Sequence, residues 1–143
     1  MPPDIAATKR LVFLMRIMFA VSGMMFAFLA FRILHPPNHP VSPTMQIPIA
    51  FVALFDVFLG FVAPGFLAKA GANSPAQRAN PVSAWFSRCI ISLAFFESCS
   101  LFAFVLRQFG GNTSVVALLF TVGIASTIFW NPGQPPSEGD TTS

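Results

Sequence analysis

Two carboxylic acids lie inside long apolar stretches of the sequence, where they are the residues most able to do chemistry. Asp56 lies near the middle of the stretch 46–68, and Glu97 lies near the middle of the stretch 84–106. A carboxylate at the centre of a bilayer costs about 2.5–3.5 kcal/mol on insertion scales. Burial favours the neutral acid, and no Lys or Arg in the apolar stretches lies at a matching depth. An intramembrane acid without a basic partner predicts a proton or cation site.

Glu97 has the richer polar surroundings of the two acids. Ser98 follows it directly, and Ser100 shares its helical face three residues further on. Carboxyl and hydroxyl oxygens are the ligands that hard cations prefer. We therefore predict an ion-binding site at Glu97, Ser98 and Ser100 with Asp56 as its helper, for a proton in first place and sodium in second. The alternative interpretation makes each acid a neutral hydrogen-bond link between helices.

The overall composition is typical of a membrane protein. Of the 143 residues, 55% are hydrophobic and only 9% are charged, whereas about 25% are charged in an average soluble domain. These values exclude a disordered chain, and a net charge of +3 is too small for a nucleic-acid-binding protein. The sequence has no phosphate-binding glycine loop and no zinc-type Cys/His cluster. We therefore expect no cofactor, no nucleic-acid partner and no enzymatic activity, and we expect the lipid bilayer as a partner.

Four apolar segments approach the roughly 20 residues that a helix needs to cross a bilayer. Only helices and closed barrels satisfy the backbone in lipid, and continuous apolar runs favour helices. The sequence therefore predicts an all-α integral membrane four-helix bundle. The spans are expected at 11–34, 46–68, 84–106 and 113–130. The connecting segments are an N-terminus at 1–10, a Pro-rich exterior loop at 35–45, a cytoplasmic loop at 69–83, an exterior turn at 107–112 and a polar C-terminal tail at 131–143.

The positive charges predict the orientation of the chain. One side holds only Arg32 and Arg107, and the other side holds six cations. Cytoplasmic loops carry the excess of Lys and Arg, so both termini are expected in the cytoplasm, in a bacterial inner membrane. Trp85 and Trp130 fall on the same side and are expected in an interfacial aromatic belt. The six cations are Lys9, Arg10, Arg16, Lys69, Arg78 and Arg88.

Small residues mark the faces on which the helices are expected to pack, because they let backbones approach closely in lipid. Asp56 falls on one of these stripes and is therefore expected inside the bundle or at a subunit contact. Association as a homo-oligomer or as a subunit of a larger membrane complex is expected. The alternative function is then that of a non-catalytic structural or assembly subunit. The predicted packing residues are Gly23, Ala27, Ala53, Gly60 and Ala63.

Two histidines lie in the first connecting loop. His35 and His39 are four residues apart, a spacing that suits a metal ion when the segment is helical. Pro36, Pro37 and Pro40 are incompatible with a helix there. The main interpretation is therefore two polar loop residues without a metal, and a metal or haem site in the loop is a minor alternative.

The region 50–106 resembles the c subunit, or proteolipid, of rotary ATP synthases. The resemblance is carried by the loop residues Arg78-Ala-Asn-Pro81 and by the following helix from Arg88 to Leu106. It implies that Glu97 is the ion-carrying acid and that Ser98 is the neighbouring hydroxyl found in sodium-type versions. The segment 46–68 lacks the dense glycine repeat of that family. The whole chain is also similar to small four-span bacterial membrane proteins with an acid in the third span.

Overall fold

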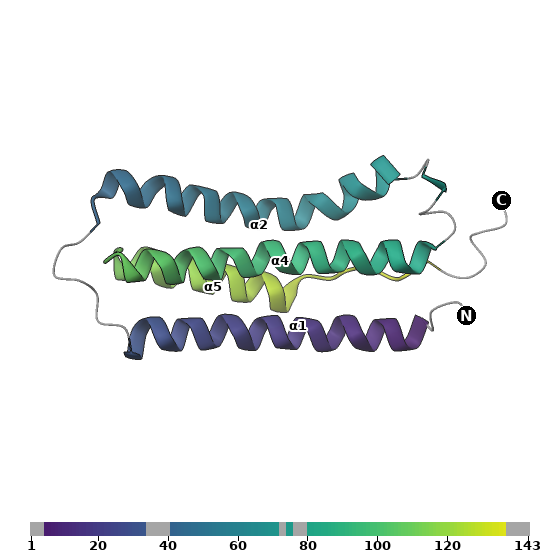
Figure 1. Cartoon of the computed structure of the whole chain (residues 1–143), viewed down its shortest axis with the longest axis horizontal. Coiled ribbons are helices and arrows are strands. Elements are labelled where there is room, and N and C mark those ends of the chain that lie inside the picture. The colour runs from purple at the N-terminus through teal and green to yellow at the C-terminus, as the bar shows by residue number, and fades with distance from the viewer. Residues whose placement is uncertain (1–4, 34–40, 72–73, 76–79, 137–143) are drawn as a thin grey trace.

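The computed structural model describes residues 5–33, 41–71, 74–75 and 80–136, and this part of the chain is built from helices (Figure 1). Helix α1 continues into a five-residue π-helical turn, η1. The predicted all-α class and the four helices are confirmed for the described residues. The elements are α1 (Ile5–Phe28), η1 (Leu29–Ile33), α2 (Pro43–Gly71), α4 (Pro81–Gln108) and α5 (Thr113–Phe129).

The helices run back and forth along the long axis of the molecule. Helices α1 and α4 point one way and α2 and α5 point the other way (Figure 1). We call one end the Pro81 end, where α1 and α4 begin and α2 ends. The opposite end is the Asn112 end, where η1 ends and α2 and α5 begin.

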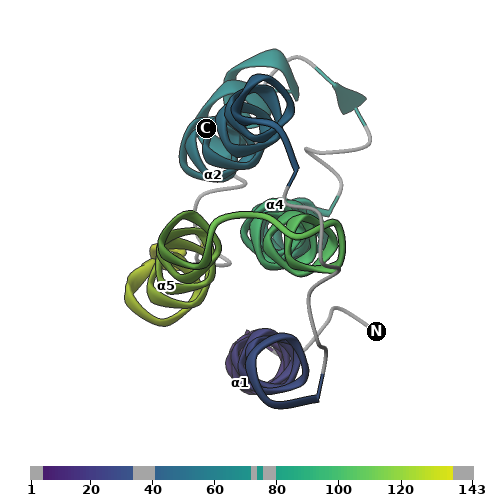
Figure 2. The same ribbon diagram turned by 90° about the vertical axis from the view of Figure 1, so that its left-hand side faces the viewer.

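Helix α4 is the centre of the structure. Viewed end-on, α1 and α2 lie on opposite sides of α4, and α5 lies beside it (Figure 2). The side chains of Leu93, Phe96 and Leu106 on α4 have no exposed surface. The fold is therefore a central helix covered by three neighbours, rather than a closed ring of four equivalent helices.

A tight glycine turn places α5 antiparallel to α4. Gly110 has φ = 81°, a conformation that glycine adopts without the penalty of a side chain. The Asn112 side chain then caps α5 by accepting a hydrogen bond from the Ser114 N–H at 2.8 Å. At the other end, Asn80 caps α4 and Pro81 occupies its first turn, where a missing N–H is harmless.

Three helices are long and apolar enough to cross a membrane: α1 with η1, α2 and α4, each of 28 or 29 residues. Such a helix is about 42 Å long, more than the roughly 30 Å of hydrocarbon in a bilayer. Helix α5 occupies the segment expected as a fourth span, but its 17 residues reach only about 26 Å. Three of the four expected spans are thus helices long and apolar enough to cross a membrane, and the fourth is a shorter apolar helix.

The outer faces of α1 and α2 are strongly apolar. Met18, Phe51 and Phe66 are each about 70% exposed. An apolar surface of this extent is unfavourable in water. It is the surface expected of helices that face lipid.

Small residues lie where the helices approach α4 most closely. Gly23, Ala53 and Gly60 are buried, and Ala27 and Ala63 are partly buried. A Cβ atom at Gly60 would lie 2.5 Å from Cε1 of Phe96. Helix α2 can therefore approach α4 only with glycine at position 60.

Two features open the structure at the Pro81 end. Helix α2 contains Pro64, which cannot donate a backbone hydrogen bond, and the helix bends away from α4 beyond the middle of its length (Figure 1). Helix α5 stops at Phe129, and residues 130–136 continue as an extended segment beside α4 (Figure 1). The C-terminal half of α2 and the extended segment thus flank the first half of α4.

The two tryptophans hold this extended segment in place. The Trp85 indole N–H donates to the Pro132 carbonyl at 3.2 Å. The Trp130 ring packs edge-on against Phe96, with 5.9 Å between the ring centroids. Both indoles are less than 10% exposed, so the tryptophans expected in an interfacial belt pack against protein.

Candidate functional site

Glu97 lies at the junction of α1, α4 and α5. The residue is buried, with 9% of its surface exposed. The Ser22 hydroxyl on α1 donates a hydrogen bond to Glu97 Oε1 at 2.7 Å. Sequence reasoning missed Ser22, although it is the sole polar residue between Arg16 and Arg32 and lies at the centre of the first apolar stretch.

Ser100 lies on the same side of α4 as Glu97. It is 1% exposed, and its hydroxyl has no hydrogen-bond partner within the described residues. A Cβ atom at Gly23 would lie 3.2 Å from Ser100 Oγ and 3.7 Å from Glu97 Oε2. The unpaired hydroxyl and the second carboxyl oxygen therefore face the same point on α1.

Helix α5 closes this junction from the other side. A Cβ atom at Gly123 would lie 2.8 Å from Ser100 Oγ and 3.1 Å from the Phe96 carbonyl oxygen. Glycines at positions 23 and 123 thus bring two helices within contact of Ser100. We call the set Ser22, Gly23, Glu97, Ser100 and Gly123 the Glu97 site.

Asp56 and Ser98 form a separate pair on the opposite side of α4. The Ser98 hydroxyl lies 2.7 Å from Asp56 Oδ2 on α2 and 2.7 Å from the carbonyl oxygen of Phe95. One residue along a helix turns the side chain by about 100°, so Ser98 faces α2 while Glu97 faces α1. The structure thus brings Glu97 and Ser100 together and places Ser98 and Asp56 apart from them.

Two arginines that lie beside the helix junctions hydrogen-bond to backbone carbonyls instead of to the acids. Arg16 Nε donates to the Thr127 carbonyl at 2.8 Å, and Arg107 Nε donates to the Ala30 carbonyl at 3.2 Å. No hydrogen bond within the described residues joins an arginine to Glu97 or Asp56. The side-chain partner of each acid is a neutral serine hydroxyl.

The positions of two arginines on α4 indicate how deep Glu97 would lie in a membrane. Arg88 and Arg107 are 19 residues apart, and Glu97 is the sole charged residue between them. On a helix this separation is about 28 Å, close to the roughly 30 Å hydrocarbon thickness of a bilayer. If the two guanidinium groups mark the membrane boundaries, Glu97 lies near the midplane.

The described residues contain no group of three or more His, Cys, Asp and Glu side chains that could hold a metal ion. His35 and His39 lie outside the described residues. Cys89 and Cys99 are free and buried. Cys99 Sγ lies 3.4 Å from the Leu119 carbonyl oxygen, as expected for a packing thiol.

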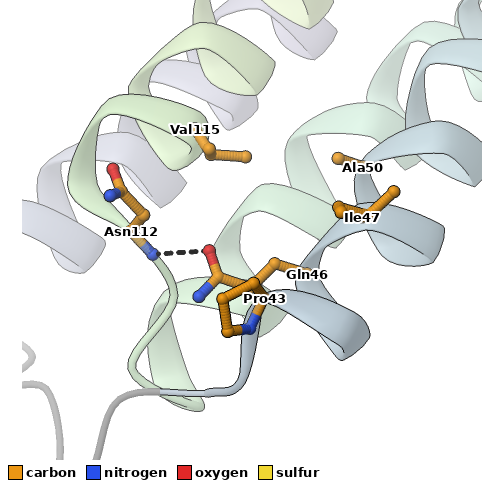
Figure 3. Close-up of a pocket in the computed structure, with 6 residues that line it drawn as sticks. All are labelled: Pro43, Gln46, Ile47, Ala50, Asn112 and Val115. Carbon is orange, nitrogen blue, oxygen red and sulfur yellow. Dashed lines mark hydrogen bonds between the residues drawn. The ribbon is translucent and has the colours of Figure 1, made fainter.

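Three hollows lie away from both acids. The one at the Asn112 end has a volume of about 280 Å³ and lies between α2 and the start of α5 (Figure 3). There the Asn112 N–H donates to Gln46 Oε1 at 3.1 Å, which fixes the start of α5 against α2 (Figure 3). The other two hollows lie at the Pro81 end, and no acid lines any of the three.

Comparison with models of protein families, with curated proteins and with solved structures finds no match for the chain. The class of protein to which the chain belongs is therefore described from its fold and its candidate site alone. In the part of the chain that the structure describes, the protein is all-helical, with three helices long and apolar enough to cross a membrane and with the buried residue Glu97 at a junction of three helices. The resemblance to the ATP synthase c subunit stays a prediction.

Proposed function

We propose that the chain is an integral membrane protein that reversibly binds a proton at Glu97, with sodium as the second candidate ion. One observation carries this proposal. Glu97 is a buried residue, its carboxyl group accepts a hydrogen bond from the neutral Ser22 hydroxyl, and its second oxygen and the unpaired Ser100 hydroxyl face the same point at Gly23. An ionised carboxylate buried without a cation is costly, so the arrangement fits a carboxylic acid that keeps its proton.

The two serines can satisfy the carboxyl group in both of its protonation states. Ser22 donates to Oε1 whether the acid is neutral or ionised, since both forms keep an acceptor oxygen. A protonated Oε2 needs an acceptor, and the Ser100 hydroxyl has free lone pairs. In the structure the Ser100 hydroxyl makes no hydrogen bond to the carboxyl group, so accepting from the acid or donating to the carboxylate requires a change of the Ser100 side-chain rotamer. Sodium would use as ligands the two carboxyl oxygens of Glu97 and the hydroxyl oxygens of Ser22 and Ser100.

The proposed setting follows from the charges and the apolar surface. We place the Pro81 end in the cytoplasm, since most cations of the sequence lie toward it. A bacterial inner membrane, and assembly as a homo-oligomer or within a larger membrane complex, complete the proposal. A role like that of the ATP synthase c subunit would put the protonation of Glu97 at a helix contact.

Carbodiimide labelling tests whether Glu97 holds a proton in the membrane. An apolar carbodiimide reacts with the protonated form of a carboxylic acid, and mass spectrometry locates the adduct. We expect an adduct on Glu97, its loss in Glu97→Gln, and its retention in Asp56→Asn as the matched control. A protein that carries no adduct on Glu97 at any pH would contradict the proposal.

A second candidate function is that of a structural subunit whose acids are neutral links between helices. The observation that favours it is the repetition of one geometry. Ser22 with Glu97 joins α1 to α4, and Ser98 with Asp56 joins α2 to α4, each at 2.7 Å. Interhelical hydrogen bonds of this kind contribute about 0.6 kcal/mol on average in membranes.

Infrared spectroscopy separates the two candidates. The carbonyl band of a protonated carboxylic acid is resolved from that of a carboxylate, and Glu97→Gln assigns the band of Glu97. Reversible proton binding predicts that this band disappears and returns as the pH is cycled. A band that stays constant while Glu97→Gln merely loosens the oligomer would support the structural function instead.

A further inference from the structure

Arg88 lines both hollows at the Pro81 end, where α2 diverges from α4. The first hollow, of about 290 Å³, is lined by Leu67 on α2 and by Ser83, Ser87, Arg88 and Ile91 among other residues. The second, of about 310 Å³, lies between Pro64 on α2, the first turns of α4 and the extended C-terminal segment. We call the first hollow the Arg88 groove.

The guanidinium group of Arg88 has hydrogen-bonding capacity to spare. It carries five N–H donors, and Nε donates to the Ala84 carbonyl of its own helix at 3.2 Å. The two acids of the described chain, Asp56 and Glu97, are paired with serines deeper in the structure. A partly buried guanidinium with no carboxylate of the described residues beside it is suited to an external anion, and its planar donors match phosphate oxygens.

The depth of the groove indicates which anion it meets. Arg88 lies about 28 Å from Arg107 along α4, at the boundary of a bilayer that α4 spans. Phospholipid phosphates lie at this boundary. Ile91 lies one helical turn from Ser87 and Arg88 toward the membrane interior, and Leu67 of α2 lines the same groove; both side chains suit an acyl chain.

We propose that the Arg88 groove binds the phosphate group of an anionic phospholipid. The guanidinium of Arg88 and the hydroxyls of Ser83 and Ser87 contact the phosphate, and the acyl chain lies over Leu67 and Ile91. A volume of about 290 Å³ is at the lower limit for small-ligand sites, so the groove accommodates the headgroup rather than a whole lipid. This site rests on the proposed membrane setting of the chain but is independent of proton binding at Glu97.

Native mass spectrometry of the full chain tests the proposal. The protein is released from micelles that contain phosphatidylglycerol, and the bound lipid is counted for wild type, Arg88→Gln and Lys69→Gln. Lys69 is exposed in the last turn of α2 and does not line the groove, so Lys69→Gln is the matched loss of one charge at the same end. We expect the affinity to fall about tenfold in Arg88→Gln, because charge-assisted hydrogen bonds are lost, and to stay unchanged in Lys69→Gln. Equal losses in the two variants, or no loss in Arg88→Gln, would overturn the site.

Two further measurements in the same experiment test which groups of the protein and of the lipid make the contact. The Ser83→Ala, Ser87→Ala double variant should bind the lipid more weakly than wild type while keeping the native helix content by circular dichroism. Inorganic phosphate should fail to displace the lipid at millimolar concentration, because it lacks the acyl chain. Displacement by inorganic phosphate would mean that the groove takes a soluble phosphate and would overturn the assignment to a lipid.

Discussion

The contact between α2 and α4 at Gly60 can be tested with a pair of substitutions in one helix. Gly60 and Gly65 both lie within α2. A Cβ atom at Gly60 would lie 2.5 Å from Cε1 and 2.9 Å from Cδ1 of Phe96, whereas nothing lies within 4 Å of a Cβ atom at Gly65. Gly65→Ala is therefore the control for Gly60→Ala.

The magnitude follows from the environment of the Phe96 ring. Carbon atoms pack best at about 3.5–4.0 Å, so the added methyl group overlaps the ring by about 1 Å. The ring cannot move aside, since Phe96 is fully buried and its ring packs between those of Phe61 and Trp130. Overpacking of this kind costs about 1–3 kcal/mol. Both variants gain the same helix propensity of about 1 kcal/mol, so Gly60→Ala should be about 1–3 kcal/mol less stable than Gly65→Ala.

Unfolding in mixed micelles by titration with sodium dodecyl sulfate, followed by circular dichroism, gives the free energy of unfolding of both variants. We expect Gly65→Ala to equal or exceed the wild type in stability and Gly60→Ala to fall below Gly65→Ala. If the two variants unfold at the same detergent fraction, α2 does not approach α4 at Gly60, and the described packing is incorrect.

Two other predictions concern α5 and the segment that follows it. Gly123→Ala should lower the free energy of unfolding by up to about 2 kcal/mol, because overpacking against Ser100 Oγ, 2.8 Å from the added Cβ, costs about 1–3 kcal/mol and the higher helix propensity of alanine returns about 1 kcal/mol. Adding Ser100→Ala should recover part of the overpacking cost in the same unfolding assay, and a double variant no more stable than the single one would contradict the contact. Trp85→Phe removes the hydrogen bond to the Pro132 carbonyl, which is worth about 0.5–1.5 kcal/mol, and should therefore speed proteolysis within residues 130–136. Mass spectrometry gives the cleavage sites and rates. If these match the wild type, Trp85 does not hold the segment.

The position of Glu97 was predictable, but its partners were only partly so. The acid is conspicuous in the sequence because it interrupts an apolar run, and Ser100 follows from helical spacing. Ser22 is 75 positions away in the chain, and no local pattern connects it to Glu97. Ser98 is adjacent to Glu97 in sequence yet faces another helix, so proximity in the chain was misleading there.

The burial of the two tryptophans was also not predictable from the local sequence. Trp85 and Trp130 lie toward one end of their apolar stretches, and that position alone suggests an interfacial aromatic belt. Helix α5 stops at Phe129, and the following segment lies against α4, which buries both rings. Whether an indole faces lipid or protein depends on what packs over it, and this cannot be read from the position of the residue in its own helix.

The sequence by itself determined the number, type and approximate bounds of the helices. Apolar runs and the prolines and glycines between them act locally, and the backbone in an apolar environment must satisfy its own hydrogen bonds within each helix. The tertiary structure decided which face of α4 meets α1 and which meets α2, and hence that Glu97 pairs with Ser22 while Asp56 pairs with Ser98. Each residue turns a helix by about 100°, so these pairings depend on how the helices are rotated against one another. That rotation is set by the close contacts at Gly23, Gly60 and Gly123, which join residues far apart in the chain.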